Sequence, residues 1–552
     1  EKQARDVLDF TDQTRLALAL VRAYPEVVAT LRERHRVVLL DEYQDTSIAQ
    51  RRLLQAIFGD GHPVTAVGDP CQAIYGWRGA SVDNIERFPE HFPLLRDGAS
   101  LPAHRYTLSS NRRSGPTILA VANDLSASLR ERHRGVPVLE SAATDKGEGT
   151  VRIGLFETAA AERTWIADEI ASSRRRIEAP GATDRWGDIA VLASTGKELD
   201  AIDTLLRERG VPTQRYGAAG LLRQPVVVEL RSMLEVLHNP IANPALVRIM
   251  TGPRWRVGVR DLVAVGARAA ELASSGHRRD TVDVDEALDD AVAGADPVEA
   301  VSLADALDDL GDPSAYSAEG YARLRALGSE IAMLRRHAGE PITELIARIA
   351  ATTGLDVELA LGSDREAQQV AWGTFVDLAA DFADLDGVSS LGAFLSRLRD
   401  AERFNIDLKV DLVARTDAVQ LLTIHKAKGL EFPHVFVPSV ARDAFPGGYA
   451  RGEWPTSASA VPWPLRDDRD DTLASFPDRD GDEGVRDKHH KAYVQVLQDL
   501  QDADDHRLAY VAMTRAEHTL VVTGHWWGPT QTKARGPHAF LETVHATVSD
   551  GR

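Results

Sequence analysis

The chain has 552 residues, of which 43% are hydrophobic and 27% charged, with a formal net charge of −19 at pH 7. This length exceeds what one core supports, so we expect about three or four globular domains. The negative charge argues against a protein that coats nucleic acid through bulk charge, but it allows a local channel that binds nucleic acid. No apolar run reaches the roughly 18 residues that span a bilayer, and a single cysteine, Cys71, excludes a disulfide framework or cysteine-rich zinc site and predicts a cytoplasmic protein.

Short apolar runs alternate with helical patterns through the first 250 residues. Strands that alternate with helices predict βαβ units around a parallel sheet. Helices are expected in ERTWIADEIASSRRRI and KELDAIDTLLRERG. The expected strands are VVLL at 37–40, PVTAVG at 63–68, TVRIGLF at 150–156 and DIAVLAS at 188–194.

The pattern changes between about 255 and 410, where strand-like runs nearly vanish and Ala, Leu, Asp and Glu dominate. This composition predicts a helical domain, whose acidic faces are expected to be solvated surface. The α/β pattern returns with VQLLTIH at 419 and ends with TLVVTGH at 519–525, which indicates a helical insertion inside an α/β domain. A stretch rich in Pro, Gly and Asp, from about 443 to 484, predicts a long surface loop.

An acidic pair, Asp41 and Glu42, directly follows the first expected strand. The carboxyl ends of parallel strands are where open α/β sheets bind ligands. In phosphoryl transfer an Asp at such a place holds Mg²⁺, and a neighbouring Glu takes a proton from the attacking water. The alternative is a helix N-cap followed by a favourable acid in the first turn.

The next expected strand ends in AVGDPCQAIYGWRGA, residues 66–80. Gln72 is suited to bonding a terminal phosphate or orienting a water, as glutamines do in nucleotide hydrolases. Tyr75, Trp77 and Arg78 have flat faces suited to stacking on unpaired bases. The alternative is that the two aromatic rings pack beneath the loop.

Together, LDEYQDTS and VGDPCQAIYGWRGA resemble motifs II and III of the UvrD/Rep/PcrA family of superfamily 1 DNA helicases. The stretch NPIANPALVRIMTGPRWRVG resembles the segment that leads into the 2B domain of this family. The resemblance covers nearly the whole chain, because three further motifs follow in the family's order. LSSNRRSGPTIL (108–119) resembles motif IV, LLTIHKAKGLEF (421–432) motif V and RLAYVAMTRA (507–516) motif VI.

The resemblance implies an α/β fold with two RecA-like parallel-sheet domains and a helical 2B insertion in the second. The first domain is expected to be truncated. The implied division is the C-terminal part of the first RecA-like domain (1A) at 1–105, the second RecA-like domain (2A) at 106–252 and 411–528 with the long loop at 443–484, the 2B insertion at 253–410, and a tail at 529–552.

A phosphate-binding loop of the form GxxxxGK[ST] is expected in such a motor, but the sequence contains no match. The nearest stretch is LASTGKEL, where Val191 replaces the first Gly and Glu198 replaces the Ser or Thr that faces the metal. We therefore interpret Gly196–Lys197 as a turn. Because LDFTDQ (8–13) resembles the family's segment just before motif II, the chain is expected to begin partway through the first motor domain.

Catalytic roles follow from the resemblance. Asp41 would coordinate Mg²⁺, Glu42 would activate the hydrolytic water, and Gln72 would sense the γ-phosphate of ATP and couple it to DNA. Arg113 and Arg515 would act as arginine fingers, because charge that develops on phosphoryl oxygens needs a permanently charged planar donor. The alternative for both arginines is a structural ion pair.

The resemblance also implies binding roles. Arg112, Gly429 and Glu431 would meet the nucleotide, with Arg112 at the place where the family usually has a Tyr that stacks on adenine. An Arg can also stack on a base, so the departure affects base selectivity more than hydrolysis. Single-stranded DNA would contact Tyr75, Trp77, Arg78 and His425, although His425 can instead be a structural histidine.

The expected function is that of an ATP-dependent 3′–5′ DNA helicase that acts on single-stranded and duplex-junction DNA in repair or recombination. WPLRDDRDD and GHWWGPTQ resemble helicase-nuclease subunits of the AddA/RecB type, particularly actinobacterial AdnB, which implies a second helicase-nuclease subunit as a partner. No nuclease motif is present in the sequence. The alternative is a non-catalytic DNA-binding or scaffold subunit. The missing phosphate-binding loop favours this alternative, and the retained hydrolytic residues oppose it.

Overall fold

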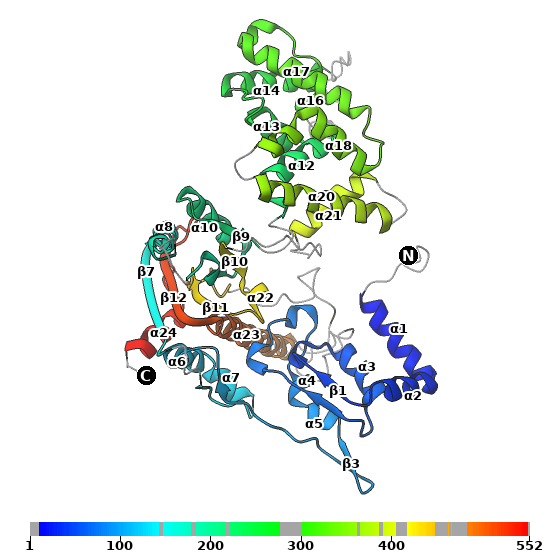
Figure 1. Cartoon of the computed structure of the whole chain (residues 1–552), viewed down its shortest axis with the longest axis vertical. Helices are drawn as coiled ribbons and strands as arrows, with labels where there is room; N and C mark the ends of the chain where they lie inside the picture. Colours follow the sequence, from blue (N-terminus) through cyan, green and yellow to red (C-terminus); the bar gives the residue numbers. More distant parts are fainter. Residues whose placement is uncertain are drawn as a thin grey trace. The chain divides into compact units, whose positions relative to one another are not determined.

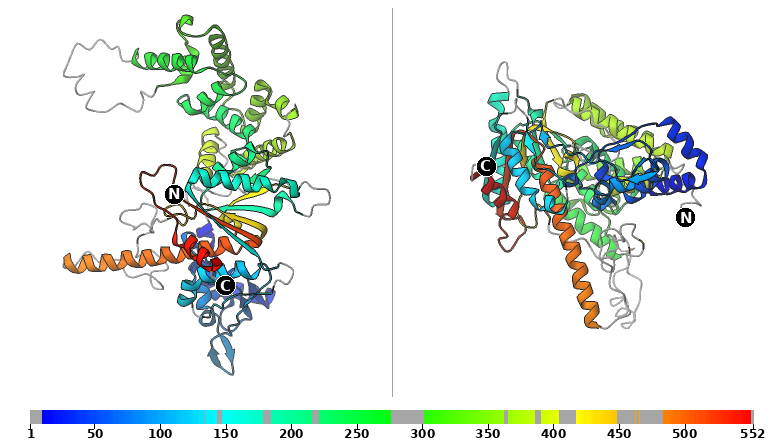
Figure 2. Two further views of the ribbon diagram at one scale, coloured as in Figure 1. Left: turned by 90° about the vertical axis from the view of Figure 1, so that its left-hand side faces the viewer. Right: turned by 90° about the horizontal axis from the view of Figure 1, so that it is seen from below.

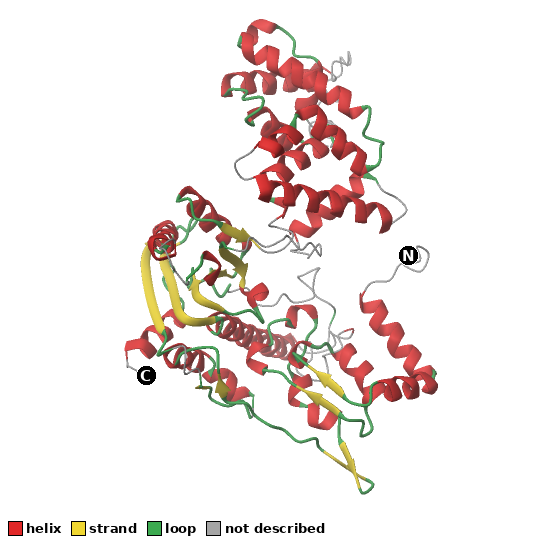
Figure 3. Cartoon of the chain, viewed as in Figure 1, coloured by secondary structure: helices red, strands yellow, loops and turns green. Residues whose placement is uncertain are grey.

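The computed structural model describes residues 10–133, 135–142, 147–177, 184–215, 221–275, 301–361, 365–385, 390–403, 417–447, 462, 465 and 483–549. Two compact units are distinguished. One consists of Glu1–Thr213 with Asp417–Arg552, and the other of Gln214–Thr416. The first is an α/β unit and the second is helical (Figures 1 and 3).

The N-terminal part of the α/β unit contains a two-stranded parallel sheet, which confirms the first two expected strands. Parallel strands are normally covered on both faces. Here Leu39 on β1 remains 77% exposed, and Val37 and Val67 beside the sheet are exposed as well. The described elements are α1 (Phe10–Ala23), α2 (Pro25–Arg34), β1 (Val38–Leu40), η2 (Tyr43–Asp45), α3 (Ile48–Phe58), β2 (Val64–Ala66), η3 (Pro70–Gln72), η4 (Gly76–Arg78), α4 (Asp83–Glu86), α5 (Phe88–His91), β3 (Leu94–Arg96) and β4 (Ala99–Leu101).

The largest sheet among the described residues has six strands, in the order β7-β12-β11-β8-β10-β9. Its neighbouring pairs from β7 to β10 run parallel, which confirms the expected parallel arrangement. The strands are β7 (Thr150–Thr158), β8 (Ile189–Ala193), β9 (Thr213–Arg215), β10 (Val419–Thr423), β11 (Phe432–Val437) and β12 (Ala516–Trp527).

Helices cover both faces of this sheet. Successive residues of a strand point to opposite faces, so neighbouring residues of β8 enter different cores. On β8, Ala190 and Leu192 pack in the core formed with α6 (Pro116–Leu125) and α24 (Ala539–Ser549). Ile189 and Val191 pack in the other core, with α8 (Ala159–Ser172) and α10 (Gly196–Glu208). The remaining described elements are β5 (Ser110–Asn111), α7 (Ala127–Arg132), β6 (Glu140–Ser141), α9 (Arg174–Ile177), η5 (Trp186–Asp188), α22 (Ile424–Ala427) and α23 (Glu483–Met513).

Gly196–Lys197 is not the expected turn, because Gly196 is the first residue of α10. Thr195 caps this helix by accepting a hydrogen bond from the backbone N–H of Glu198. The Glu198 carboxylate accepts hydrogen bonds from Arg163 Nε at 2.7 Å and Nη2 at 2.5 Å. The lookalike of a phosphate-binding loop is therefore an ordinary strand-to-helix connection, held by an ion pair.

The expected long loop at 443–484 lies mostly outside the described residues, which include only 443–447, 462, 465 and its last two residues. Those last two, 483 and 484, already belong to α23. This helix has 31 residues and is drawn in orange in Figure 2. Two residues separate its last residue, Met513, from the start of β12, so motif VI runs from the end of this helix into the sheet.

Glu162 on α8 is fully buried and ties this helix to β12 and to the segment that follows β11. Its Oε1 atom accepts hydrogen bonds from the Ser439 backbone N–H at 2.7 Å and from the Thr523 hydroxyl, and its Oε2 atom contacts His525 Nδ1 at 2.6 Å. Each carboxylate oxygen is therefore satisfied, as a buried carboxylate requires.

Replacing Glu162 with Ala should destabilise the α/β unit by about 3–5 kcal/mol, because three buried donors lose their acceptor. Urea unfolding, with hydrogen exchange of α8 and β12 to assign the transition to this unit, measures the loss. Asp168 on the same helix is exposed and pairs with Arg209, so Asp168→Ala is the matched control and should cost less than about 1 kcal/mol. An equal effect of both substitutions would contradict the role of Glu162.

The second unit has no strand between residues 225 and 403 in its described part (Figure 3). Its core includes Leu230, Leu234, Ile346, Phe375 and Phe394. Two of its helices precede residue 253, so this packing unit begins earlier than the predicted insertion. The helices are α12 (Pro225–His238), α13 (Asn243–Thr251), α14 (Val259–Ser275), α16 (Leu303–Asp308), α17 (Ala318–Arg335), α18 (Ile342–Thr353), α19 (Leu355–Leu361), α20 (Arg365–Leu385) and α21 (Leu391–Arg403).

Much of the acidic stretch DEALDDAVAGADPVEAVSLADALDDL, expected to be solvated helix surface, lies outside the described residues, because residues 276–300 are not among them. Across the described helices of both units, none combines the length and apolar character needed to cross a membrane.

Candidate active site

A cavity of about 580 Å³ in the α/β unit collects five of the residues predicted from the sequence. They come from four separate stretches of the chain: η3, the segment after β5, the residue just before β11, and the connection between α23 and β12. Asp69, Tyr510 and Thr514 also line it. The five predicted residues are Gln72, Arg112, Arg113, Glu431 and Arg515.

Arg515 is the most constrained cation of this cavity, with only 1% of its surface exposed. Its Nε atom donates to the Val511 carbonyl at 3.0 Å and its Nη1 atom to the Leu430 carbonyl at 3.1 Å. Its Nη2 atom donates to Gln72 Oε1 at 3.3 Å. Burial, together with the neighbouring Arg113, lowers the pKa of the Arg515 guanidinium to about 10.

No carboxylate within the described parts of the chain forms an ion pair with Arg515. The alternative of a structural ion pair is therefore wrong for this residue as far as the described residues show. A buried guanidinium held by neutral carbonyl and amide oxygens keeps its charge available to an anion that enters the cavity.

Arg113 differs from Arg515, because it already has an anionic partner. Its Nε atom donates to Glu431 Oε2 at 2.6 Å, and its Nη1 atom donates to the Thr514 carbonyl at 3.3 Å. The Asn111 side chain accepts a hydrogen bond from the Arg113 backbone N–H at 2.8 Å and fixes this turn. Arg113 would have to exchange Glu431 for a phosphate in order to act on a nucleotide.

Gln72 is held between two charged residues. Its Nε2 atom donates to Asp69 Oδ2 at 2.8 Å, and its Oε1 atom accepts from Arg515. Arg112 is exposed at the cavity wall, where its planar group is free to stack. Gly429 does not line the cavity. Its φ of +81° is readily adopted only by glycine, and it lets the chain turn between α22 and β11.

Asp41 and Glu42 are exposed and lie outside the cavity lining. Glu42 has a left-handed backbone, with φ of +50° and ψ of +37°, and its side chain makes no capping hydrogen bond. Ser47 caps the following helix, α3, in a capping box with Gln50. The N-cap alternative is therefore wrong for this pair. Asp41 Oδ1 accepts a hydrogen bond from the Glu42 backbone N–H at 2.9 Å, and Glu42 Oε2 accepts one from the Gln44 side chain.

The described residues contain no group of three or more His, Cys, Asp or Glu side chains arranged to hold a metal on their own. Mg²⁺ in nucleotide sites is commonly held by one or two carboxylates together with substrate phosphates. An exposed carboxylate such as Asp41 fits this mode.

Lys428, which was not among the predicted site residues, joins Glu42 to Gln72. Its side chain is only 5% exposed. Its Nζ atom donates to Asp45 Oδ2 at 2.5 Å and to the Gln72 carbonyl at 2.7 Å, and it lies 3.4 Å from Glu42 Oε2. Motif V contains two lysines, and nothing local distinguishes Lys428 from Lys426, because the role of Lys428 depends on contacts with residues more than 350 positions away.

Three aromatic rings meet beside Lys428. His425 on α22 lies 6.1 Å from Tyr75 and 6.2 Å from Trp77 between ring centres, and the Tyr75 hydroxyl donates to the His425 carbonyl at 3.0 Å. Trp77 is 69% exposed, so the alternative that it packs beneath the loop is wrong, whereas Tyr75 is half-buried. Arg78 lies over the Trp77 ring at 5.6 Å. Burial lowers the pKa of His425, which favours a neutral ring at pH 7.

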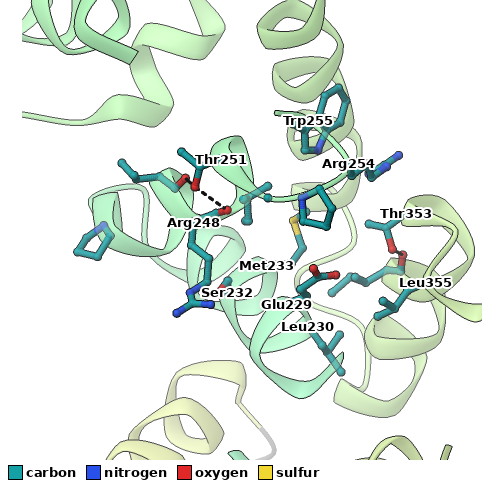
Figure 4. Close-up of a pocket in the computed structure, with 16 residues that line it drawn as sticks. Glu229, Leu230, Ser232, Met233, Arg248, Thr251, Arg254, Trp255, Thr353 and Leu355 are labelled. Atoms are coloured by element: carbon teal, nitrogen blue, oxygen red, sulfur yellow. Dashed lines mark hydrogen bonds between the residues drawn. The ribbon is translucent and has the colours of Figure 1, made fainter. Parts of the chain in front are cut away.

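A second cavity, of about 500 Å³, lies among α12, α13, α18 and the loop at 252–255 in the helical unit (Figure 4). Glu229, Met233 and Trp255 line it, and burial raises the pKa of the Glu229 carboxyl. None of the residues predicted to bind nucleotide or DNA lies there.

Comparison with known families agrees with the motif order. Residues 1–93 match the UvrD/REP helicase N-terminal domain, and residues 106–274 and 365–525 match the UvrD-like helicase C-terminal domain. The second match alone covers more than half of the chain.

Curated relatives carry helicase names. The chain is 28% identical over 464 residues to "ATP-dependent DNA helicase UvrD1" of Mycobacterium tuberculosis, covering 80% of this chain and 55% of that protein. It is 24% identical over 551 residues to "DNA helicase II" of Rickettsia typhi, covering 99% and 67%. It is 24% identical over 525 residues to "ATP-dependent DNA helicase PcrA" of Staphylococcus aureus, covering 94% and 59%. The chain thus spans about 55% of the length of the UvrD1 relative.

Proposed function

The chain belongs to the UvrD/Rep/PcrA family of superfamily 1 helicases, and from this premise we propose that it is the motor part of an ATP-dependent 3′–5′ DNA helicase that acts in repair or recombination. One observation carries the proposal: Gln72, Arg113 and Arg515 reach one cavity from three separate motifs. A cavity lined by two guanidiniums and a glutamine suits the terminal phosphate of a nucleotide.

Each predicted residue has a role in this proposal. Asp41 holds Mg²⁺, which supplies charge neutralisation on the phosphates when bound, and Glu42 accepts the proton of the attacking water. Arg515 and Arg113 stabilise the charge that develops on the transferred phosphoryl group. Gln72 reports the presence of that group through its bond to Arg515.

Binding of the nucleotide body falls to other residues. Arg112 stacks on the base, Glu431 meets the sugar, and Gly429 shapes the turn that carries Glu431.

The phosphate-binding loop that this motor needs is absent from the sequence. The exposed apolar side chains of Val37, Leu39 and Val67 mark the two-stranded sheet as incompletely covered. Exposed Val and Leu on a parallel sheet favour burial against further strands. We propose that strands bearing the phosphate-binding loop pack there in the functional protein.

The deciding experiment compares ATP hydrolysis by the full-length protein, with and without a poly(dT) oligonucleotide, and strand displacement from duplexes with 3′ or 5′ tails. Stimulation by DNA and displacement only from the 3′-tailed duplex are expected. Tight DNA binding without hydrolysis would instead support the second candidate, a non-catalytic scaffold subunit.

A helicase-nuclease origin is a further part of the proposal. The segment GHWWGPTQ, which carries this resemblance, begins in β12, and its Trp526 and Trp527 are 47% and 38% exposed. Tryptophan is over-represented in protein interfaces, so this strand end is suited to contacting a second helicase-nuclease subunit.

Replacing Trp77 with Ala should weaken the binding of single-stranded DNA by about 1–3 kcal/mol, because the exposed indole offers one stacking face. Fluorescence anisotropy of a labelled dT oligonucleotide, titrated with this 552-residue chain, measures the change. Trp165, which packs against Phe156 on the far side of the large sheet from this cluster, gives the control Trp165→Phe. Unchanged affinity of Trp77→Ala would remove Trp77 from the stacking role.

A further inference from the structure

Arg507 on α23 is a buried cation to which the proposed function gives no role. Each of its three side-chain nitrogens has a partner: Nε donates to the Pro70 carbonyl at 3.1 Å, Nη1 donates to Asp504 Oδ1 at 2.9 Å, and Nη2 lies 2.9 Å from His133 Nε2. Pro70 is the first residue of η3, and Gln72 is the last. Arg507 therefore joins α23 to the backbone two residues before the proposed sensor of the γ-phosphate.

The bond between Gln72 and Arg515 depends on where η3 lies along α23. It joins Gln72 Oε1 to Arg515 Nη2 at 3.3 Å, which is at the long end of the hydrogen-bonding range, so a small shift of η3 breaks it. Cys71, in the middle of η3, packs against Tyr510 of α23, but apolar packing has no preferred direction. The directional bond from Arg507 to η3 therefore fixes the position that packing alone leaves free.

His133 determines how the Arg507 side chain lies. Because an arginine carries only N–H donors, His133 Nε2 accepts the hydrogen bond from Arg507 Nη2, and the ring proton is on Nδ1. That Nδ1–H donates to Glu86 Oε1 at 2.7 Å. His133 is buried, whereas the Glu86 side chain is partly exposed. Glu86 thus selects the tautomer of His133 that can hold Arg507.

Neither His133 nor Glu86 lies in a stretch that resembles a helicase motif. His133 directly follows α7, and Glu86 is the last residue of α4. The simplest alternative is that this pair only joins the two helices and supports the fold. The bond from His133 to Arg507 extends the pair beyond these helices to η3, and this bond is what an experiment must separate from support of the fold.

We propose that His133 is a positioning residue for ATP hydrolysis, which acts by fixing Arg507 and, through it, Gln72. Arg507 then holds the Pro70 carbonyl in place, and Gln72 stays within reach of Arg515. His133 does not line the cavity, so it works through these residues and not on the nucleotide. This inference rests on the proposed function and adds to it a residue from outside the family motifs.

Two substitutions of His133 separate positioning from support of the fold. Gln places an amide oxygen near the position of Nε2 and can still accept from Arg507, whereas Asn reaches only the position of Nδ1. In ATP hydrolysis by the full-length protein, His133→Asn should lower kcat by about 10- to 100-fold, because Gln72 is misplaced. His133→Gln should keep kcat within about threefold of the wild type. The KM for ATP should change little in either variant, because Arg112 and Glu431, which are proposed to meet the base and the sugar, lie outside this chain of bonds.

His91→Asn is the matched control for these variants. His91 Nε2 lies 2.6 Å from Arg51 Nη1 in the same kind of buried contact, and neither residue lines the cavity, so kcat should stay at the wild-type value. The thermal unfolding midpoint shows whether each variant retains the fold.

The outcomes separate the two proposals. A full-length wild type that does not hydrolyse ATP would overturn the proposed function and the positioning role together. A hydrolysing wild type in which His133→Asn has a kcat no lower than that of His133→Gln would overturn the positioning role alone, as would an equal loss in the His91→Asn control. Should His133→Asn fail to fold, His133→Met replaces it, because Met has the length of Gln without its amide acceptor. Its kcat must then fall below that of His133→Gln, and equal values would also overturn the role of His133.

Discussion

Replacement of Arg515 with Lys is expected to lower DNA-stimulated ATP hydrolysis of the full-length protein by about 10³- to 10⁵-fold. Lys has one nitrogen centre, whereas Arg515 divides its three nitrogens among Val511, Leu430 and Gln72. A lysine can satisfy only part of that set, and it cannot present a planar pair of N–H groups to a phosphoryl oxygen. The loss should appear mainly in kcat, because the charge that Arg515 stabilises develops in the transition state.

Arg163→Lys is the matched control for this substitution. Arg163 is a largely buried arginine of the same α/β unit, but it pairs with Glu198 away from the cavity. Its replacement should leave hydrolysis unchanged. The thermal unfolding midpoint of both variants shows whether the fold is retained. Near-normal hydrolysis by a folded Arg515→Lys protein would show that this guanidinium does not act on the nucleotide.

Arg113 should respond differently, because its charge is already partly neutralised by Glu431. An arginine that must leave one anion for another gains less from the exchange than one without an anionic partner. The two predicted arginine fingers are therefore unequal in this structure, although the motifs present them as equivalent.

The main strands could be predicted because local sequence determines them. The β8 run is buried at every position and the β10 run at nearly every one, as strands covered on both faces require, so their apolar residues form uninterrupted stretches in the sequence. Gly196–Lys197 was misjudged because a Gly–Lys pair is locally compatible with a turn. The Thr195 cap and the ion pair of Glu198 with Arg163 start a helix there instead.

The candidate site could be predicted only in part. Motif order identified Gln72, Arg113 and Arg515, and the structure brings these three to one cavity. The contacts of Lys428 and the Arg113–Glu431 ion pair join residues more than 300 positions apart, and no local pattern encodes such contacts. The left-handed backbone of Glu42 was equally invisible, because Glu carries no sequence preference for that conformation.

Backbone strain at Glu42 leads to a prediction with two opposite readouts. A residue with a Cβ atom at φ of +50° costs roughly 1 kcal/mol relative to glycine, and such strain concentrates at functional sites. Glu42→Gly should therefore stabilise the chain by about 1 kcal/mol while lowering hydrolysis by about 10²- to 10⁴-fold, the usual contribution of a general base. Urea unfolding and steady-state hydrolysis measure the two effects.

Two comparisons make this prediction specific to Glu42. Glu42→Gln keeps the strained backbone and removes the base together with the charge that lies 3.4 Å from Lys428, so hydrolysis should fall equally without any gain in stability. Asp60→Gly relieves a similar φ of +54° in the turn before β2, outside the cavity, so it should stabilise the chain and leave hydrolysis intact. If Glu42→Gly stabilises the protein but Glu42→Gln hydrolyses ATP normally, the strain belongs to the turn and another group must be the base. If both lose hydrolysis and only Glu42→Gly gains stability, the chain tolerates a strained residue here because the reaction needs its carboxylate at this place.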